Sequence, residues 1–222
     1  MIKTFDSVVL SLANWALTRR DKTMILISGG GAAGKSIFCE ALSAKIGSKN
    51  LNRINADAYL IDSSARANAL WRSDIDGKIV EGRLTACCKI ATFLSGLNRD
   101  IRSVHAGYHV WTVEDFGSPS VLLDSNKRIC IVEGVGACFS DISLFDASVF
   151  MYCDAEGEYE RRLPRDKNIR GIQIEKIKAD FDLRRAQFAV EVFPRRNLFS
   201  LVLRSAEDYS LLVEKDNLGI TR

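Results

Sequence analysis

The sequence has no long hydrophobic run and no excess of charge of one sign. No stretch reaches the roughly 18 consecutive apolar residues that a membrane-spanning helix needs, so we expect no membrane partner. The 31 Lys and Arg residues nearly balance the 28 Asp and Glu residues, and the net charge of +3 argues against a nucleic-acid partner. The first 20 residues show no cleavage site of a secretory signal, so a cytoplasmic location is expected.

The sequence is also poor in histidine, in proline and in paired cysteines. Its two histidines, His105 and His109, have no serine or cysteine nucleophile system around them, which argues against triad-type catalysis. Three prolines and 47% hydrophobic residues are typical of a globular protein with a substantial core. The six cysteines lack the spacing of a zinc site and are expected to be reduced core thiols: Cys39, Cys87, Cys88, Cys130, Cys138 and Cys153.

What the sequence does contain is an alternation of short apolar runs and helical patterns. This alternation predicts a single α/β domain with a mainly parallel sheet and right-handed crossovers. Helices are expected at 1–20, 35–46, 83–97 and 171–192. Strands are expected at 24–28, 51–55, 101–104, 128–134, 147–153 and 198–205, with a hairpin around the Gly-Ser-Pro at 117–119.

The stretch GGGAAGKS at 29–36 matches the phosphate-binding pattern G-x-x-x-x-G-K-[ST], between a predicted strand and a predicted helix. Glycines let the backbone wrap around a phosphate with its N–H groups inward, and the helix N-terminus adds a favourable dipole. Lys35 is expected to reach the β and γ phosphates of a nucleotide, and Ser36 to ligate Mg²⁺. The predicted nucleotide-binding residues are Gly29, Gly30, Gly31, Ala32, Ala33, Gly34, Lys35, Ser36 and Ile37.

Two acids at the ends of predicted strands are candidates for the chemistry. Asp57, in NADAYL, follows the second strand, where a carboxylate can accept a proton from a substrate hydroxyl. A helix cap is the alternative role for Asp57, and its rivals as the base are Asp62, Asp74 and Asp76. Glu133 ends the run ICIVEG, an arrangement that orients Mg²⁺ or its water beside a phosphate-binding loop.

Two further segments have competing interpretations. The segment EYERRLPRDKNIRG at 158–171 is predicted to be a lid, because phosphoryl transfer needs mobile positive charge over the phosphates. The alternative is a solvated helix face, in which the arginines pair with Glu158, Glu160 and Asp166. The segment at 71–83 is interpreted as an exposed loop or as a reader of a polar substrate, through stacking on Trp71 and hydrogen bonds from Asp74 or Asp76.

The sequence resembles the uridine kinase and phosphoribulokinase family of P-loop kinases in four motifs that occur in the same order. They are GGGAAGKS at 29–36, DAY at 57–59, IVEG at 131–134 and RRLPRDKNIRG at 161–171. The resemblance extends weakly to QFAVEVFP at 187–194. It implies a P-loop NTPase-type three-layer sandwich with helices on both faces of the sheet, in one domain, 1–222. That domain would hold an N-terminal helix at 1–20, an acceptor-side insertion at 63–120 and the lid. The chain departs from the family at Ala32 and Ala33, and 63–119 lacks the histidine and aromatic pattern of uridine kinases.

The resemblance also implies roles for individual residues. ATP and Mg²⁺ would be the cofactors, and the catalytic residues would be Lys35, Asp57 and Arg165. Ser36 and Glu133 would hold the metal ion. The arginines that clamp the phosphates would be Arg162, Arg165 and Arg170, and a small hydroxyl acceptor would face Asp57, Tyr59, Arg66, His105 and Tyr108.

Together these features predict an ATP- and Mg²⁺-dependent kinase that transfers the γ phosphate to a hydroxyl of a small metabolite, such as a nucleoside or a sugar. An ATP-binding regulatory or sensor module without phosphotransfer is the alternative, motivated by the loop alanines and the unmatched acceptor region. The stretch NKRI at 126–129 is not the N-K-x-D base reader of GTPases, and the lid disfavours a hydrolytic ATPase. The oligomeric state is left open, a homo-oligomer included.

Overall fold

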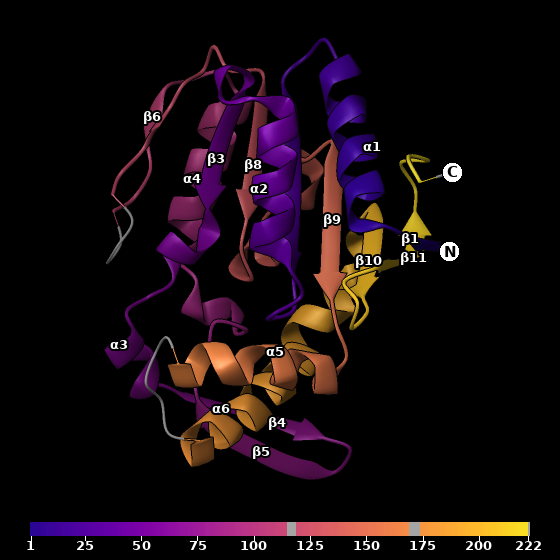
Figure 1. Ribbon diagram of the computed structural model, residues 1–222. Helices are drawn as coiled ribbons and strands as arrows, with labels where there is room; N and C mark the ends of the chain where they lie inside the picture. Colours follow the sequence, from indigo (N-terminus) through magenta and orange to yellow (C-terminus); the bar gives the residue numbers. More distant parts are fainter. Residues whose placement is uncertain (115–118, 169–173, 222) are drawn as a thin grey trace.

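The computed structural model describes residues 1–114, 119–168 and 174–221, and the side chains of these except 165–168 and 174–176. A seven-stranded sheet forms the centre, in the order β1-β11-β10-β9-β2-β8-β3 (Figure 1). From β10 to β3 the neighbours are parallel, whereas β11 and β1 join antiparallel at one edge. The bounds are β1 Ile2–Lys3, β2 Thr23–Gly29, β3 Leu51–Asn55, β8 Ile129–Glu133, β9 Ala147–Tyr152, β10 Leu201–Ser205 and β11 Leu211–Asp216.

Helices cover both faces of this sheet. Along the buried strand β2, Ile25 and Ile27 pack into a core cluster with α1 (Phe5–Thr18) and α2 (Lys35–Ile46). Met24 and Leu26 point to the opposite face, because successive strand residues alternate, and pack with α4 (Leu94–His105) and the π-helical turn Phe188–Val192. The predicted three-layer sandwich with a mainly parallel sheet is therefore confirmed.

A smaller group of elements lies beyond the carboxyl ends of the parallel strands (Figure 1). It comprises α3 Ser63–Ala67, the antiparallel hairpin of β4 Leu70–Ile75 and β5 Lys78–Arg83, α5 Ala155–Asn168 and α6 Ile174–Gln187. The hairpin packs against α6 so closely that a Cβ atom at Gly82 would lie 2.8 Å from the Leu183 side chain. Short turns complete the chain at Ser48–Asn50, Ala56–Tyr59, Lys89–Ala91, Gly136–Phe139, Ile142–Leu144 and Phe193–Leu198.

The predicted helix at 83–97 and the predicted strand at 101–104 are wrong. Residue 83 ends β5, and a single helix, α4, covers 94–105. Leu97, Ile101 and Val104 recur at helical spacing and are buried against the sheet, so an apolar run that looks like a short strand is one face of a helix. The pairing of β5 with β4 and their packing on α6 are tertiary contacts that the local pattern does not reveal.

The remaining predicted elements are confirmed. The helices at 1–20 and 35–46 and the five other strands are present, and the helix at 171–192 corresponds to α6 and the π turn, with 171–173 outside the described residues. The hairpin around 117–119 is present as β6 Val110–Trp111 paired with β7 Leu122–Leu123. All six cysteines are buried and free. Among the described residues, no helix is long and apolar enough to cross a membrane.

Candidate functional site

The glycine-rich loop joins the carboxyl end of β2 to the start of α2. Gly34 precedes the helix with a φ of 87°, and no side chain caps the first turn of α2. The free N–H groups of this turn and the positive end of the helix dipole therefore face the loop, which is the arrangement that binds phosphate. The Lys35 side chain is only 8% exposed, and its Nζ donates to the Gly30 carbonyl over 2.6 Å. The loop lines a cavity of about 500 Å³.

Glu158 anchors the first part of the predicted lid against this loop. A Cβ atom at Gly31 would lie 2.5 Å from the Glu158 carboxylate, so a larger residue there would displace Glu158. The Glu158 side chain is 2% exposed and pairs with Arg162 over 3.1 Å and with Arg185 over 2.9 Å. This cluster joins α5, α6 and the loop. The pairing of Arg162 with Glu158 is the one that the alternative of a solvated helix face predicted, but Glu158 is buried and the Arg162 side chain is only 11% exposed, so neither is solvated.

Glu133 and Ser36 meet at the mouth of the loop. The Ser36 hydroxyl donates to Glu133 Oε1 over 3.4 Å. Burial raises the pKa of Glu133, the nearby Asp57 also raises it, and the positive charges of Lys35 and Arg53 oppose the shift. Oxygen ligands of this kind fit Mg²⁺, which is commonly held by one or two protein oxygens together with substrate phosphates and water. Within the described residues, no cluster of three or more His, Cys, Asp or Glu side chains offers an all-protein metal site.

Asp57 lies beside these two residues and lines the same cavity. The backbone N–H of Asp57 donates a hydrogen bond to the side chain of Asn55. The residue that caps the short turn Ala56–Tyr59 is therefore Asn55 and not Asp57. Gly134 adopts a φ of 150°, and a Cβ atom there would lie 2.9 Å from Asp57 Oδ1. The glycine after Glu133 thus lets the two strand ends bring their carboxylates together.

The rival acids do not share this position. Asp62 caps α3, where its side chain accepts from the Ser64 backbone N–H over 2.7 Å. Asp74 accepts from the Gly77 backbone at the tip of the β4–β5 hairpin, and Asp76 lies in the same turn with a φ of 52°. In the described structure, none of the three lines this cavity or the larger cavity that adjoins it along β3. We therefore retain Asp57 as the candidate base.

Arginine side chains form the opposite wall of the cavity. Arg161 donates to the Ala32 carbonyl over 3.2 Å and stacks on the Tyr209 ring at 4.7 Å. Tyr209 is 57% exposed and holds a φ of 62°, a strained backbone for an aromatic residue. Sequence reasoning did not predict Tyr209, because it lies in a loop far from every motif. Of the other lid arginines, the side chain of Arg165 and the whole of Arg170 lie outside the described residues.

Arg66 lies in the same cavity as Asp57, as predicted for a residue near the acceptor, and Arg184 of α6 joins it. Arg66 Nε donates to the Ile61 carbonyl over 2.9 Å. Burial lowers the pKa of Arg66, and the positive charges of Arg184 and Arg83 lower it further. Several guanidinium groups therefore converge near the candidate base. Arg184 was not predicted, because its distance from Arg66 along the chain hides their proximity.

Four other residues that were considered for the substrate lie elsewhere. Tyr59 is 1% exposed and donates its hydroxyl to Asp100 of α4. His105 and Tyr108 are exposed at the end of α4 and line neither cavity. Trp71 is buried, and its Nε1 donates to Glu191 over 2.7 Å, so it cannot stack on a substrate. The alternative of an exposed loop at 71–83 is also wrong, because these residues form the β4–β5 hairpin.

The Tyr59–Asp100 contact predicts a stability effect. Replacing Tyr59 with phenylalanine removes the hydroxyl and leaves the buried Asp100 carboxylate with Arg99, which binds it over 2.6 Å. We expect unfolding to become easier by about 2 kcal/mol and the Tm to fall by about 4–8 °C. Thermal unfolding would measure this, with Tyr108→Phe at an exposed tyrosine as the matched control. A Tm unchanged in Tyr59→Phe would show that the contact contributes nothing to stability.

The comparison with protein families decides the classification. The model of the phosphoribulokinase / uridine kinase family matches residues 92–208, more than half of the 222-residue chain. The chain belongs to this family. The resemblance seen in the motifs is thus confirmed, and members of the family are small-molecule kinases that act on hydroxyl groups. No curated protein matches the sequence.

Solved structures show the same fold. Phosphoribulokinase from Rhodobacter spheroides is 15% identical with a TM-score of 0.62, over 84% of this chain and 71% of that one. A protein assigned as a fructose transport system kinase from Silicibacter sp. TM1040 is 14% identical with a TM-score of 0.60, over 86% and 96%. A protein assigned as a uridine kinase from Bacillus stearothermophilus is 12% identical with a TM-score of 0.51, over 89% and 96%. This family member therefore shares the architecture of proteins from which its sequence has diverged widely.

Proposed function

We propose that this member of the family transfers the γ phosphate of ATP to a hydroxyl group of a small metabolite, with Mg²⁺ as the metal. The observation that carries the proposal is one cavity whose wall joins Lys35 and Ser36 of the loop to Glu133 and Asp57. Phosphate-binding groups, oxygen ligands for a metal and a candidate base thus face one space. A phosphoryl transfer requires this combination and little covalent chemistry from the protein.

The residues would act in the following way. The loop N–H groups and Lys35 hold the nucleotide phosphates, and Ser36 and Glu133 hold Mg²⁺ directly or through water. A Mg²⁺ ion held there would supply positive charge that offsets the negative charge of the nucleotide phosphates. Asp57 accepts the proton of the acceptor hydroxyl while the hydroxyl oxygen forms a bond to the γ phosphorus. The bond between the γ phosphorus and the bridging oxygen breaks, and ADP leaves with the electron pair.

The arginines near Asp57 support an acceptor that carries a negative charge. Arg184 and Arg83 lie near enough to Arg66 to lower its pKa, against the opposite effect of Asp62 and Asp57. Arg83 is itself paired with Asp180. An anionic group on the acceptor would offset the positive charge around Arg66 and would receive charge-assisted hydrogen bonds from a guanidinium. A hydroxy acid or a sugar phosphate therefore fits the cavity better than a neutral nucleoside.

Arg66→Gln tests this charge preference. The variant is expected to raise the KM of an anionic acceptor by about tenfold or more, since a hydrogen bond to a charged group is lost, and to leave the KM of ATP nearly unchanged. Arg102→Gln, at an exposed arginine of α4 that pairs with Asp141, is the matched control. Steady-state kinetics with the acceptor varied would measure both. An equal acceptor KM in Arg66→Gln and wild type would remove Arg66 from acceptor binding.

The experiment that tests the kinase proposal is ADP release from Mg-ATP with a panel of candidate acceptors. The panel includes sugars, nucleosides, sugar acids, sugar phosphates and amino alcohols, with the Lys35→Ala protein as the blank. ADP release that depends on an acceptor and exceeds the blank supports the kinase. ATP binding without ADP release for any acceptor supports the sensor module instead.

The cytoplasmic location, the absence of nucleic-acid and membrane partners and the oligomeric state remain predictions.

A further inference from the structure

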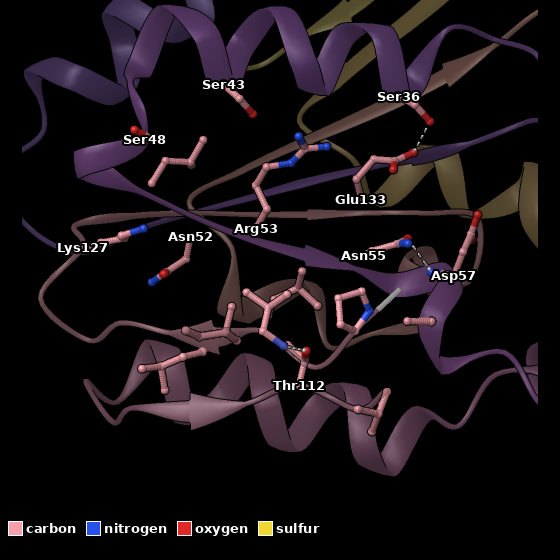
Figure 2. A pocket seen from close by; sticks show the side chains of 18 of the residues that line it. Ser36, Ser43, Ser48, Asn52, Arg53, Asn55, Asp57, Thr112, Lys127 and Glu133 are labelled. Atoms are coloured by element: carbon pink, nitrogen blue, oxygen red, sulfur yellow. Dashed lines mark hydrogen bonds between the residues drawn. The ribbon is translucent and has the colours of Figure 1, made fainter. Parts of the chain in front are cut away.

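A second and larger cavity, of about 990 Å³, runs along the edge strand β3. It lies between α2 and the β6–β7 hairpin, and Figure 2 shows Asp57 at one end and Lys127 at the other. Ser36, Asp57 and Glu133 line both cavities, so the two spaces meet at the candidate metal and base. The loop residues before Ser36 line only the smaller cavity. The groove along β3 is therefore not part of the phosphate pocket.

The two long walls of this groove differ in chemistry. Arg53, Asn52 and Lys127 supply positive charge and amide groups from β3 and the segment before β8. The facing wall, on the hairpin, is mainly apolar and includes Val113, Val121 and Leu122 beside Thr112. Val121 and Leu122 are 50% and 45% exposed, although residues of this kind are normally covered. A ligand that lies in the groove would therefore meet cations on one side and aliphatic side chains on the other, with the acids Asp57 and Glu133 confined to one end.

Neither cation forms a close ion pair within the described residues, although Arg53 lies near enough to Glu133 to act on its pKa. Figure 2 shows Arg53 reaching from β3 toward α2, with Ser43 and Glu133 on either side. Among the side chains that the structure describes, neither Arg53 nor Lys127 forms an ion pair with an acid. Arg128, the next residue in the chain, shows the contrast, because its guanidinium is bound by the carbonyl groups of Leu17 and Arg19. The charge of Lys127 is thus available to a bound anion, whereas the charge of Arg53 is shared with Glu133.

We propose that this groove is a second ligand site, which takes a small organic anion with an apolar body. The acidic head would bind Lys127, at the end of the groove away from Asp57, and the apolar part would cover Val113, Val121 and Leu122 (Figure 2). Arg53 would add positive charge from farther along the groove. The volume lies at the upper end of the range for small-molecule pockets, which agrees with a ligand of cofactor size. The groove has no glycine loop, so it is not a second triphosphate site. Because it borders Glu133 and Ser36, its occupant is placed to modulate the phosphate pocket as an effector.

Binding of 8-anilinonaphthalene-1-sulfonate tests this site without relying on kinase activity. This probe joins an acidic head to aromatic rings and fluoresces when its rings leave water. We expect saturable binding of a single probe molecule per chain, weakened about tenfold or more in Arg53→Gln/Lys127→Gln. The exposed residues Lys45 and Arg102 lie outside the groove, so Lys45→Gln/Arg102→Gln is the matched control and should bind the probe as wild type does.

Three results would overturn the proposal. The first is equal affinity of the two double variants for the probe, with both proteins folded by circular dichroism and thermal unfolding. The second is equal affinity of wild type for the uncharged analogue N-phenyl-1-naphthylamine, because the head group would then play no part. The third is displacement of the probe by inorganic tripolyphosphate or by an acceptor found in the ADP assay, which would merge the groove with the catalytic site. A failed kinase assay alone leaves the expected probe binding unchanged.

Discussion

Replacing Lys35 with alanine is expected to lower kcat/KM for Mg-ATP by about 10²–10³-fold or more, the loss typical of removing a preorganised electrostatic contact to the transition state. The ammonium group lies at the start of α2 beside the Gly30 carbonyl, where it reaches the space enclosed by the loop. Among the described side chains, the other cations that line this cavity are arginines of α3, α5 and α6, which lie outside the loop. Steady-state kinetics with an active acceptor would measure the effect.

The control for this variant lies on the same helix. Lys45 is exposed in the last turn of α2 and lines neither cavity, so Lys45→Ala should keep wild-type kinetics. Both variants should fold, since alanine favours a helix. A Lys35→Ala protein that binds and turns over Mg-ATP like wild type would show that the loop does not hold the phosphates in the proposed way.

Replacing Asp57 with asparagine is expected to lower kcat by about 10²–10⁴-fold and to leave the affinity for ATP nearly unchanged. The asparagine amide has almost the shape of the aspartate carboxylate, so it fits in the same space beside Gly134. That space is narrow, because a Cβ atom added at Gly134 would lie 2.9 Å from Asp57 Oδ1. It cannot accept the acceptor proton and remain neutral, so the chemical step slows while the nucleotide still binds. Rapid-quench or steady-state kinetics together with fluorescent ATP-analogue binding would separate the two effects.

Asp62→Asn is the matched control for this variant. Asp62 caps α3 and lines neither cavity, so its replacement should change stability slightly and turnover little. Full activity in Asp57→Asn would remove Asp57 from the mechanism. A loss of ATP affinity equal to the loss of kcat would instead place Asp57 in nucleotide or metal binding.

The parts of the site that the sequence predicted are those that depend on neighbours in the chain. The strand, glycine loop and helix around Lys35 form a local unit. Glu133 ends the apolar strand β8, and Asp57 follows two residues after the end of β3. Parallel strands place their carboxyl ends at one edge, which is why acids 76 residues apart by their numbers line one cavity.

The parts that the sequence did not reveal depend on contacts between distant segments. Tyr59 follows the DAY motif, yet its hydroxyl finds Asp100 inside the core and turns the ring away from the cavity. Arg184 reaches the cavity because α6 packs against the β4–β5 hairpin. The spacing of apolar residues along the sequence does not predict this packing. Tyr209 approaches the loop only because β10 and β11 form a hairpin at the sheet edge. Tertiary packing decides each of these positions.

The most direct test of the central claim is to follow the γ phosphate itself. Wild-type protein would be incubated with γ-labelled ATP, Mg²⁺ and an active acceptor from the panel, and the labelled products would be separated by chromatography. The proposed kinase predicts label in a phosphate monoester of the acceptor, in amounts equal to the ADP formed, and no such product with Lys35→Ala. Label found only in inorganic phosphate, or ATP that stays bound and intact with every acceptor, would contradict the account.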